Sequence, residues 1–199
     1  MGSPPLSDRL RVLLIDRDPE RSAVVEQALV AVGHQVVGHG DSTIGLYDEV
    51  SRLEPDVIVI DTESPDRDTL EHICLLSERT PRPVVLFTDE QDGSIIREAV
   101  RAGVTAYIVD GLAAERVVPI VQVAMARFDE FQSVKAERDE AQAKLAERKL
   151  VERAKGILMR KRGMTEEDAY HALRRMAMEK KLRMSEVADR LISMSPLLG

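Results

Sequence analysis

Short apolar segments rich in Val and Ile alternate with amphipathic segments through the first 110 residues. Each apolar segment is almost uninterrupted, which is typical of a strand buried on both faces of a sheet. The expected strands are 11–16, 34–38, 56–61, 83–89 and 106–110. The segments between them predict helices at about 19–32, 43–53, 68–79 and 92–102, with another after Gly111. Five strand–helix repeats predict an α/β fold, a doubly wound five-stranded parallel sheet.

The second part of the chain predicts helices only. Between Val121 and Gly156 neither Gly nor Pro interrupts a run of helix formers, so we expect a long helix, with Pro119 near its start or at a kink. An apolar stripe along this helix consists of Phe128, Phe131, Val134, Ala141 and Leu145. Arg138 and Arg148 interrupt the stripe, which leaves two alternatives, a homodimer formed through this helix or a solvated spacer helix.

Local signals divide the end of the chain into short helices. Gly163 is a typical residue just beyond a helix end, and Thr165 with Asp168 forms a capping box that opens the next helix. Ser185 is expected to cap a last one. Each helix has one apolar face, so together they predict a small three-helix bundle. The expected parts are a sheet domain at 9–124, a helical linker at 125–146 and a helical domain at 147–199.

Charge is unevenly distributed between these parts. Residues 1–131 carry 12 Arg and no Lys against 24 acidic residues, a net charge of −12, while residues 132–199 carry 16 basic against 11 acidic residues, a net charge of +5. A basic face on a small helical unit is typical of a protein that binds the phosphate backbone of a nucleic acid. The candidate RNA-binding residues are Arg153, Lys155, Gly156, Arg160, Arg162, Arg174 and Arg175.

Two details sharpen this hypothesis. Gly156 lies on the cationic side of its helix, where glycine costs about 1 kcal/mol relative to alanine, and a close approach of another backbone would explain it. Tyr170 is the single aromatic residue of positions 132–199, so a base-stacking platform for unstructured single strands is not expected. A folded hairpin or a duplex is therefore the expected ligand.

Acidic and hydroxyl side chains follow the predicted strands at their carboxyl ends. Asp16 and Asp18 follow the first strand, Asp61 ends the third, and Thr88 ends the fourth. In the flavodoxin-like strand order 2-1-3-4-5 the first and third strands are neighbours, so the three carboxylates are expected to converge. Converging carboxylates repel one another unless a cation joins them, and oxygen ligands of this kind suit Mg²⁺. The alternative is that these acids cap the helices that follow.

These strand-end residues make the region similar to the receiver (CheY-like) domain of bacterial response regulators. The resemblance implies that Asp61 is the phosphoacceptor, Asp16 and Asp18 the acidic pair that holds Mg²⁺, and Thr88 the switch hydroxyl. The family has a lysine followed by proline after the fifth strand, where this chain reads Asp110 and Gly111. A carboxylate in place of that cation reverses the local field. We therefore expect an acidic pocket with a structural or partner-binding role.

Residues 147–198 resemble an ANTAR domain, through the run AKGILM and the spaced AYxxLRRxAM. Together with 60-IDTESPDRD-68, FTDE and AYIVDG, the chain resembles the nitrate-assimilation antiterminators of the NasT type. The resemblance implies an RNA-binding transcription antiterminator that binds hairpins in leader mRNA and answers to a nitrate- or nitrite-sensing regulatory protein. A phosphorylation-dependent two-component regulator that binds DNA is the alternative.

Other classes of protein are not expected. Cys74 is the single cysteine, which suits a reducing compartment, and no apolar run approaches the roughly 20 residues that span a bilayer. The N-terminus does not resemble a secretion signal, so we expect a cytoplasmic protein. The sequence has no evident Ser–His–acid set and no glycine-rich phosphate loop, so we expect no enzyme and no required cofactor. Mg²⁺ is the one ion that the acidic pocket would suit.

Overall fold

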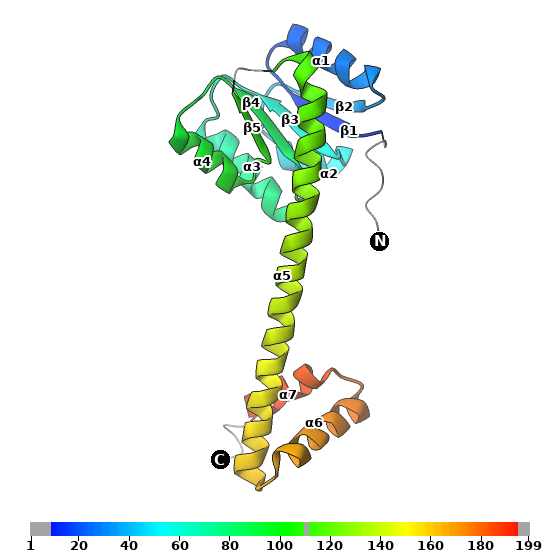
Figure 1. Cartoon of the computed structure of the whole chain (residues 1–199), viewed down its shortest axis with the longest axis vertical. Helices are drawn as coiled ribbons and strands as arrows, with labels where there is room; N and C mark the ends of the chain where they lie inside the picture. Colours follow the sequence, from blue (N-terminus) through cyan, green and yellow to red (C-terminus); the bar gives the residue numbers. More distant parts are fainter. Residues whose placement is uncertain (1–8, 110–111, 195–199) are drawn as a thin grey trace. The chain divides into compact units, whose positions relative to one another are not determined.

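The computed structural model describes residues 9–109 and 112–194, and the chain divides into two compact units after Gln132. The first unit is built on a parallel sheet with the order β2-β1-β3-β4-β5 (Figure 1). Its strands are β1 (Arg11–Ile15), β2 (Gln35–Gly40), β3 (Val57–Asp61), β4 (Val84–Thr88) and β5 (Ala106–Val109). This is the predicted fold and strand order, and the observed strands lie within about two residues of the predicted ones.

Helices cover both faces of this sheet, and each face has its own apolar layer. The helices of the first unit are α1 (Pro19–Ala31), α2 (Leu46–Leu53), α3 (Arg67–Arg79), α4 (Gly93–Ala102) and the beginning of α5 (Ala114–Arg162). Residues of α2, α3 and α4 pack against one set of strand residues, including Leu13 and Ile58. Residues of α1 and α5 pack against the alternate set, including Leu14 and Phe87. The sheet is therefore doubly wound, and its strands are buried on both sides, as their uninterrupted apolar runs predict.

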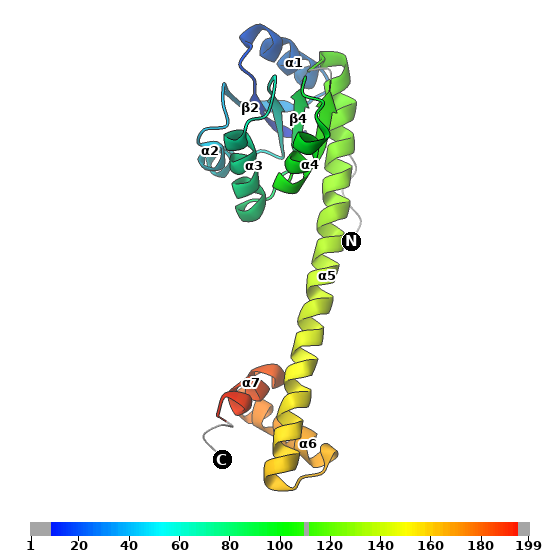
Figure 2. The ribbon, with the colours of Figure 1, turned by 90° about the vertical axis from the view of Figure 1, so that its left-hand side faces the viewer.

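The second unit consists of the end of α5, α6 (Glu166–Lys180) and α7 (Met184–Met194) (Figure 2). Its apolar centre is formed by Ala154, Leu158, Ala169, Leu173 and Ala188, which are all nearly inaccessible to solvent. Gly163 follows the end of α5 with a φ of +64°, and the Thr165 side chain accepts the Asp168 N–H, as the capping-box prediction requires. The predicted three-helix unit is therefore confirmed.

Two details of the helices differ from their predictions. α5 is one continuous helix of 49 residues that begins at Ala114, so the helix expected after Gly111 and the long helix expected from Val121 are one, with Pro119 near its start. α7 begins at Met184, which makes Ser185 part of its first turn. The Glu186 carboxylate accepts the backbone N–H of Arg183 at 2.7 Å, so the side chain that caps this helix reaches back from within it. Among the described residues, no helix is long and apolar enough to cross a membrane.

Candidate functional sites

The register of the sheet brings two predicted carboxylates together. Ile15 of β1 pairs with Ile60 of β3, so the next residues along the two strands, Asp16 and Asp61, are neighbours at the carboxyl edge. Both side chains are almost fully buried. Two buried carboxylates in contact need a positive charge, because neither can be fully hydrated there.

Arg21, in the first turn of α1, supplies that charge. Its Nε donates to Asp16 Oδ2 at 3.0 Å and its Nη2 to Asp16 Oδ1 at 2.7 Å, and the same Nη2 forms an ion pair with Asp61. Arg21 is not among the site residues expected from the sequence. A signal was present, because Arg21 lies three residues after the N-cap of the helix that follows the acidic strand end, within reach of Asp16.

Asp18 lines the same pocket as Asp61, with its side chain engaged at the start of α1. Its side chain caps α1 by accepting the backbone N–H groups of Glu20 and Arg21 at 3.0 and 3.2 Å, which is the alternative that the sequence left open. In residues 9–109 and 112–194, no group of three or more His, Cys, Asp or Glu side chains is arranged to hold a metal ion. Asp16, Asp18 and Asp61 therefore do not fit a Mg²⁺ ion held by all three, and the guanidinium of Arg21 lies between the two that do meet.

Thr88 lies at the same edge of the sheet, with its hydroxyl already engaged. Its Oγ1 donates to the carbonyl of Glu63 at 2.8 Å and accepts the N–H of Glu90 at 3.1 Å. The Tyr107 hydroxyl donates to the carbonyl of Glu90 at 3.0 Å, so β4, β5 and the loop after β3 are tied together. Asp110, the residue at the expected lysine position, lies outside the described residues.

Burial dominates the acid–base properties of this pocket. It raises the pKa of Asp61 from 3.8 to about 6, against the opposing effect of the Arg21 charge. The hydrogen bonds to Asp16 raise the pKa of Arg21, so Arg21 stays cationic. A nucleophilic aspartate needs a free ionised oxygen next to cations that can receive the phosphoryl group. Here the guanidinium is bound to the carboxylates themselves, so the one cation of the cluster is already engaged by both acids.

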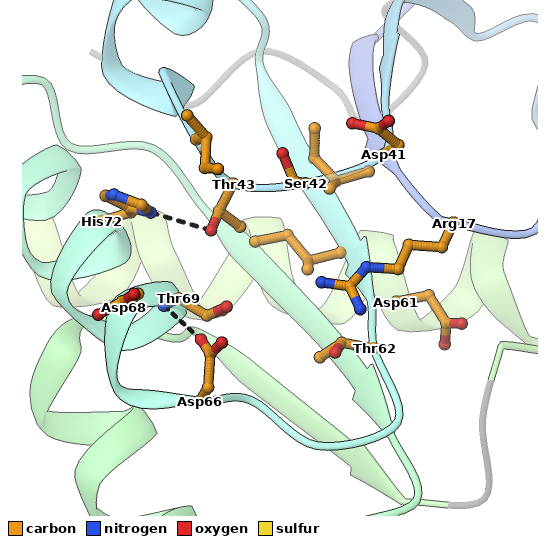
Figure 3. Close-up of a pocket in the computed structure, with 13 residues that line it drawn as sticks. Arg17, Asp41, Ser42, Thr43, Asp61, Thr62, Asp66, Asp68, Thr69 and His72 are labelled. Atoms are coloured by element: carbon orange, nitrogen blue, oxygen red, sulfur yellow. Dashed lines mark hydrogen bonds between the residues drawn. The ribbon is translucent and has the colours of Figure 1, made fainter.

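A small cavity of about 120 Å³ adjoins this cluster between the loops that follow β2 and β3 (Figure 3). Arg17 projects into it from the end of β1. Thr43 and His72 are hydrogen-bonded across its wall at 3.0 Å, and the Asp66 carboxylate accepts the N–H of Thr69 at 2.8 Å. Two pairs of polar groups in the wall are therefore joined to each other.

The second unit presents its charge differently. Arg153, Arg160, Arg162, Arg174 and Arg175 are all exposed. Within the described part of the chain, none of these five arginines forms an ion pair with a carboxylate. Five hydrated guanidinium groups on one small unit form a surface that attracts phosphate.

Lys155 differs from these five arginines, and its predicted place on the exposed cationic side is wrong. It is only 8% exposed, and its Nζ donates to Glu152 at 2.9 Å and to Glu166 at 2.8 Å. The reason is its position four residues after Val151 and three before Leu158, at the edge of the apolar face, where the start of α6 covers it. The hydrogen bond to Glu166 raises the pKa of Lys155, so this lysine stays charged and ties α5 to α6.

Gly156 has no packing partner that requires glycine. A Cβ built there would meet only the guanidinium of Arg160, 3.5 Å away, which is ordinary contact. The partly exposed backbone at Gly156 therefore remains a candidate for close approach by a ligand.

Comparisons with known proteins cover both units. The ANTAR domain family matches residues 139–192. The transcriptional regulatory protein PdtaR of Mycobacterium tuberculosis is 29% identical over 179 residues, covering 90% of this chain and 87% of that protein. The nitrate regulatory protein of Klebsiella oxytoca is 53% identical over 53 residues, which are 27% of this chain and 13% of that protein.

A solved structure supports the fold of the first unit. The signal receiver domain of a modulated diguanylate cyclase from Desulfovibrio desulfuricans G20 superposes with a TM-score of 0.53 and 21% identity, covering 61% of this chain and 98% of that one. At this identity the likeness shows the fold alone, which is that of a receiver domain.

Proposed function

Because the chain carries an ANTAR domain behind a domain of receiver fold, we propose that it is an RNA-binding transcription antiterminator. In this proposal the second unit binds hairpins in nascent leader mRNA and prevents the terminator from forming. The observation that carries the proposal is the set of five exposed arginines without ion pairs in the described chain, on a segment of net charge +5 within a protein of net charge −7. A protein with this function acts where the leader mRNA is transcribed, so the proposal includes a cytoplasmic location.

The genes under control are inferred from the relatives. The 53% identity to a nitrate regulatory protein over 53 residues supports a role in nitrate or nitrite assimilation. A nitrate- or nitrite-sensing regulatory protein is the partner that such a role requires. A homodimer through α5 belongs to the same proposal, because Phe131, Val134 and Leu145 are all more than half exposed on that helix.

The receiver unit is proposed to work without phosphate chemistry. Arg21 forms ion pairs with both Asp16 and Asp61, and Thr88 is bound to the loop after β3, so both the acceptor and the switch are engaged in other interactions. This disfavours the alternative of a phosphorylation-dependent DNA-binding regulator. Stoichiometric labelling of Asp61 by acetyl phosphate, lost in Asp61→Asn, would support that alternative instead.

One binding experiment tests the proposed function. Full-length protein is titrated into labelled leader RNA of its own operon, with two predicted hairpins, and separately into duplex DNA of the same sequence. We expect the RNA to be retained at concentrations that leave the DNA free. Equal affinity for both would show generic phosphate attraction and would contradict the proposal. Read-through of the leader terminator in a transcription reaction, with and without the protein, then measures antitermination directly.

A further inference from the structure

The small cavity between the loops that follow β2 and β3 has no part in the proposed RNA binding. Its floor is apolar, because Ile15 of β1 and Ile60 of β3 lie there with almost no exposure to solvent. Ile44 lines it from the loop after β2 and is 80% exposed, more than any other large apolar side chain of the described residues. An apolar side chain so exposed beside a cavity is stabilised by a ligand that covers it.

The volume of the cavity limits the size of that ligand. An apolar cavity of about 150 Å³ encloses benzene, a molecule of six non-hydrogen atoms. The cavity in this structure measures about 120 Å³, so a molecule of about the same number of atoms fits it. Nucleotides and large aromatic molecules are too big to enter.

One cation faces the cavity without a partner. Arg17 projects into it from just after β1, and in residues 9–109 and 112–194 it forms neither a hydrogen bond nor an ion pair (Figure 3). A guanidinium binds a carboxylate through two parallel, charge-assisted hydrogen bonds. Thr43 and His72, hydrogen-bonded to each other at 3.0 Å, keep another part of the wall in place. The cavity therefore presents a cationic donor beside a wall that is already formed.

Two carboxylates of the lining are also without a partner. Asp41, on the loop after β2, and Asp68, in the first turn of α3, accept no hydrogen bond from another residue in the described part of the chain. The two other aspartates of the lining already bind Arg21 and the N–H of Thr69. Asp41 and Asp68 are therefore the acceptors that the cavity offers to a ligand.

A ligand with a single charge does not suit this lining. An anion would bind Arg17 but would be repelled by Asp41 and Asp68, and a simple amine would be repelled by Arg17. A molecule that carries a carboxylate and an ammonium group a few atoms apart satisfies charges of both signs. Its remaining atoms can then cover the isoleucines of the floor and the rim.

We propose that this cavity binds a small α-amino acid with an apolar side chain. Arg17 donates to the carboxylate of the amino acid, Asp41 and Asp68 accept from its ammonium group, and Ile44 covers its side chain. The inference goes beyond the proposed RNA binding and does not rest on it. It gives the receiver unit a chemical input other than phosphate, at loops that adjoin the acidic cluster.

The test measures binding of L-alanine to the full chain by isothermal titration calorimetry. The melting temperature of the first unit is a second readout, because a ligand that binds only the folded state raises it. Propionate, which lacks the ammonium group, and L-alaninamide, which lacks the carboxylate, are probes of nearly the same size. We expect L-alanine to bind about 10- to 100-fold more tightly than either probe, because each lost group removes charge-assisted hydrogen bonds. L-Tryptophan, which is too large for the cavity, should not bind.

Variants assign the binding to the cavity. Arg17→Gln and Asp68→Asn are each expected to weaken L-alanine binding about 10-fold or more. Arg17→Gln should leave the weak affinity for L-alaninamide unchanged, because that probe has no carboxylate to lose. Arg67→Gln removes an exposed arginine that is next to Asp68 but outside the lining, and as the matched control it should bind L-alanine like the wild type. The melting temperature without ligand checks that each variant folds.

Three results would overturn the amino-acid site. The first is neither heat nor a rise in melting temperature with L-alanine at millimolar concentration. The second is binding of propionate or L-alaninamide as tight as that of L-alanine, since the ligand would then not need both charges. The third is unchanged L-alanine affinity in both Arg17→Gln and Asp68→Asn, which would place the amino acid elsewhere. RNA binding is measured separately with the hairpin, so none of these results decides the proposed function.

Discussion

The acidic edge of the sheet and the basic helices of the second unit both concentrate charge, and they differ in what neutralises it. At the sheet edge the fold provides its own counter-ion, since Arg21 contacts both Asp16 and Asp61. In the second unit Lys155 likewise forms ion pairs within the chain, with Glu152 and Glu166. The five exposed arginines of that unit form no ion pair with a carboxylate among the described residues. Charges paired within the chain serve stability, and charges left in water are the ones available to a partner.

Arg21→Ala removes the counter-ion of the sheet edge, and it is expected to cause the largest loss of stability among the variants. It leaves two buried carboxylates uncompensated, which for a fully buried pair costs about 3–5 kcal/mol. Arg21 is 38% exposed at its side chain, so we expect about 2–3 kcal/mol of lost stability in the first unit at neutral pH. Urea unfolding measures the loss.

Two controls belong to this measurement. Arg21→Lys keeps one charge but not the geometry that reaches both carboxylates, and should fall between the wild type and Arg21→Ala. Arg17→Ala removes an exposed arginine from the neighbouring cavity and should change stability little. A loss in Arg17→Ala equal to that in Arg21→Ala would mean that general charge, and not the bridge, supports the pocket.

The double variant Arg174→Gln/Arg175→Gln tests the exposed arginines of the second unit. Both side chains are exposed on α6, so we expect stability to be nearly unchanged and hairpin RNA binding to fall on the order of 10- to 100-fold. The slope of log affinity against log salt should become shallower by roughly one for each phosphate contact removed. Electrophoretic mobility shifts at four salt concentrations give both quantities.

Two further variants show whether such an effect is local. Arg97→Gln/Arg101→Gln removes the same charge from exposed positions of α4 and should leave RNA affinity unchanged. Lys155→Ala should lower the melting temperature of the second unit, because it breaks the contacts to Glu152 and Glu166, and leave the salt slope as in the wild type. A shallower slope in Lys155→Ala would return this lysine to the RNA surface.

Asp61→Asn probes the sheet edge through its pH dependence. The folded pKa of Asp61, about 6, lies above its ordinary value of 3.8, so the folded state binds this proton more tightly than the unfolded state. The resulting stabilisation is complete below about pH 4 and is lost as the pH rises through 6. Asp61→Asn removes this dependence, so relative to the wild type it should gain stability between pH 4 and pH 7, about 2–3 kcal/mol for a shift of this size.

Chemical unfolding of both proteins across this pH range provides the measurement. Asp41→Asn, at an exposed carboxylate of the neighbouring cavity, serves as the matched control. A difference between Asp61→Asn and the wild type that stays constant from pH 4 to pH 7 would contradict a raised pKa for Asp61.

The sequence predicted the sheet because its strands are buried on both faces, and burial of that kind leaves an uninterrupted run of Val, Ile and Leu. It also predicted that Asp16 and Asp61 meet, since parallel neighbours end at the same edge. It did not predict which cation joins them, because Arg17 is next to Asp16 in sequence and Arg21 is five residues away, yet the first turn of α1 is what brings Arg21 to both carboxylates. The exposure of Lys155 was predicted wrongly for a related reason. A residue at the edge of an apolar face is exposed or buried according to which residues of the next helix pack over it.

Gly156→Ala is expected to have the smallest effect on folding and tests the reason for the glycine. A Cβ at this position meets only the guanidinium of Arg160 at 3.5 Å, so alanine fits and should stabilise the helix by up to about 1 kcal/mol. If RNA approaches the backbone there, the same methyl group should weaken hairpin binding severalfold without changing the salt slope, because no charge is lost. Ala143→Gly is the reverse substitution, on an exposed turn of α5 outside the proposed RNA-binding residues. It should lower the free energy of unfolding by a similar amount and leave RNA binding unchanged. Gly156→Ala with higher stability and unchanged RNA affinity would show that no ligand backbone approaches this turn.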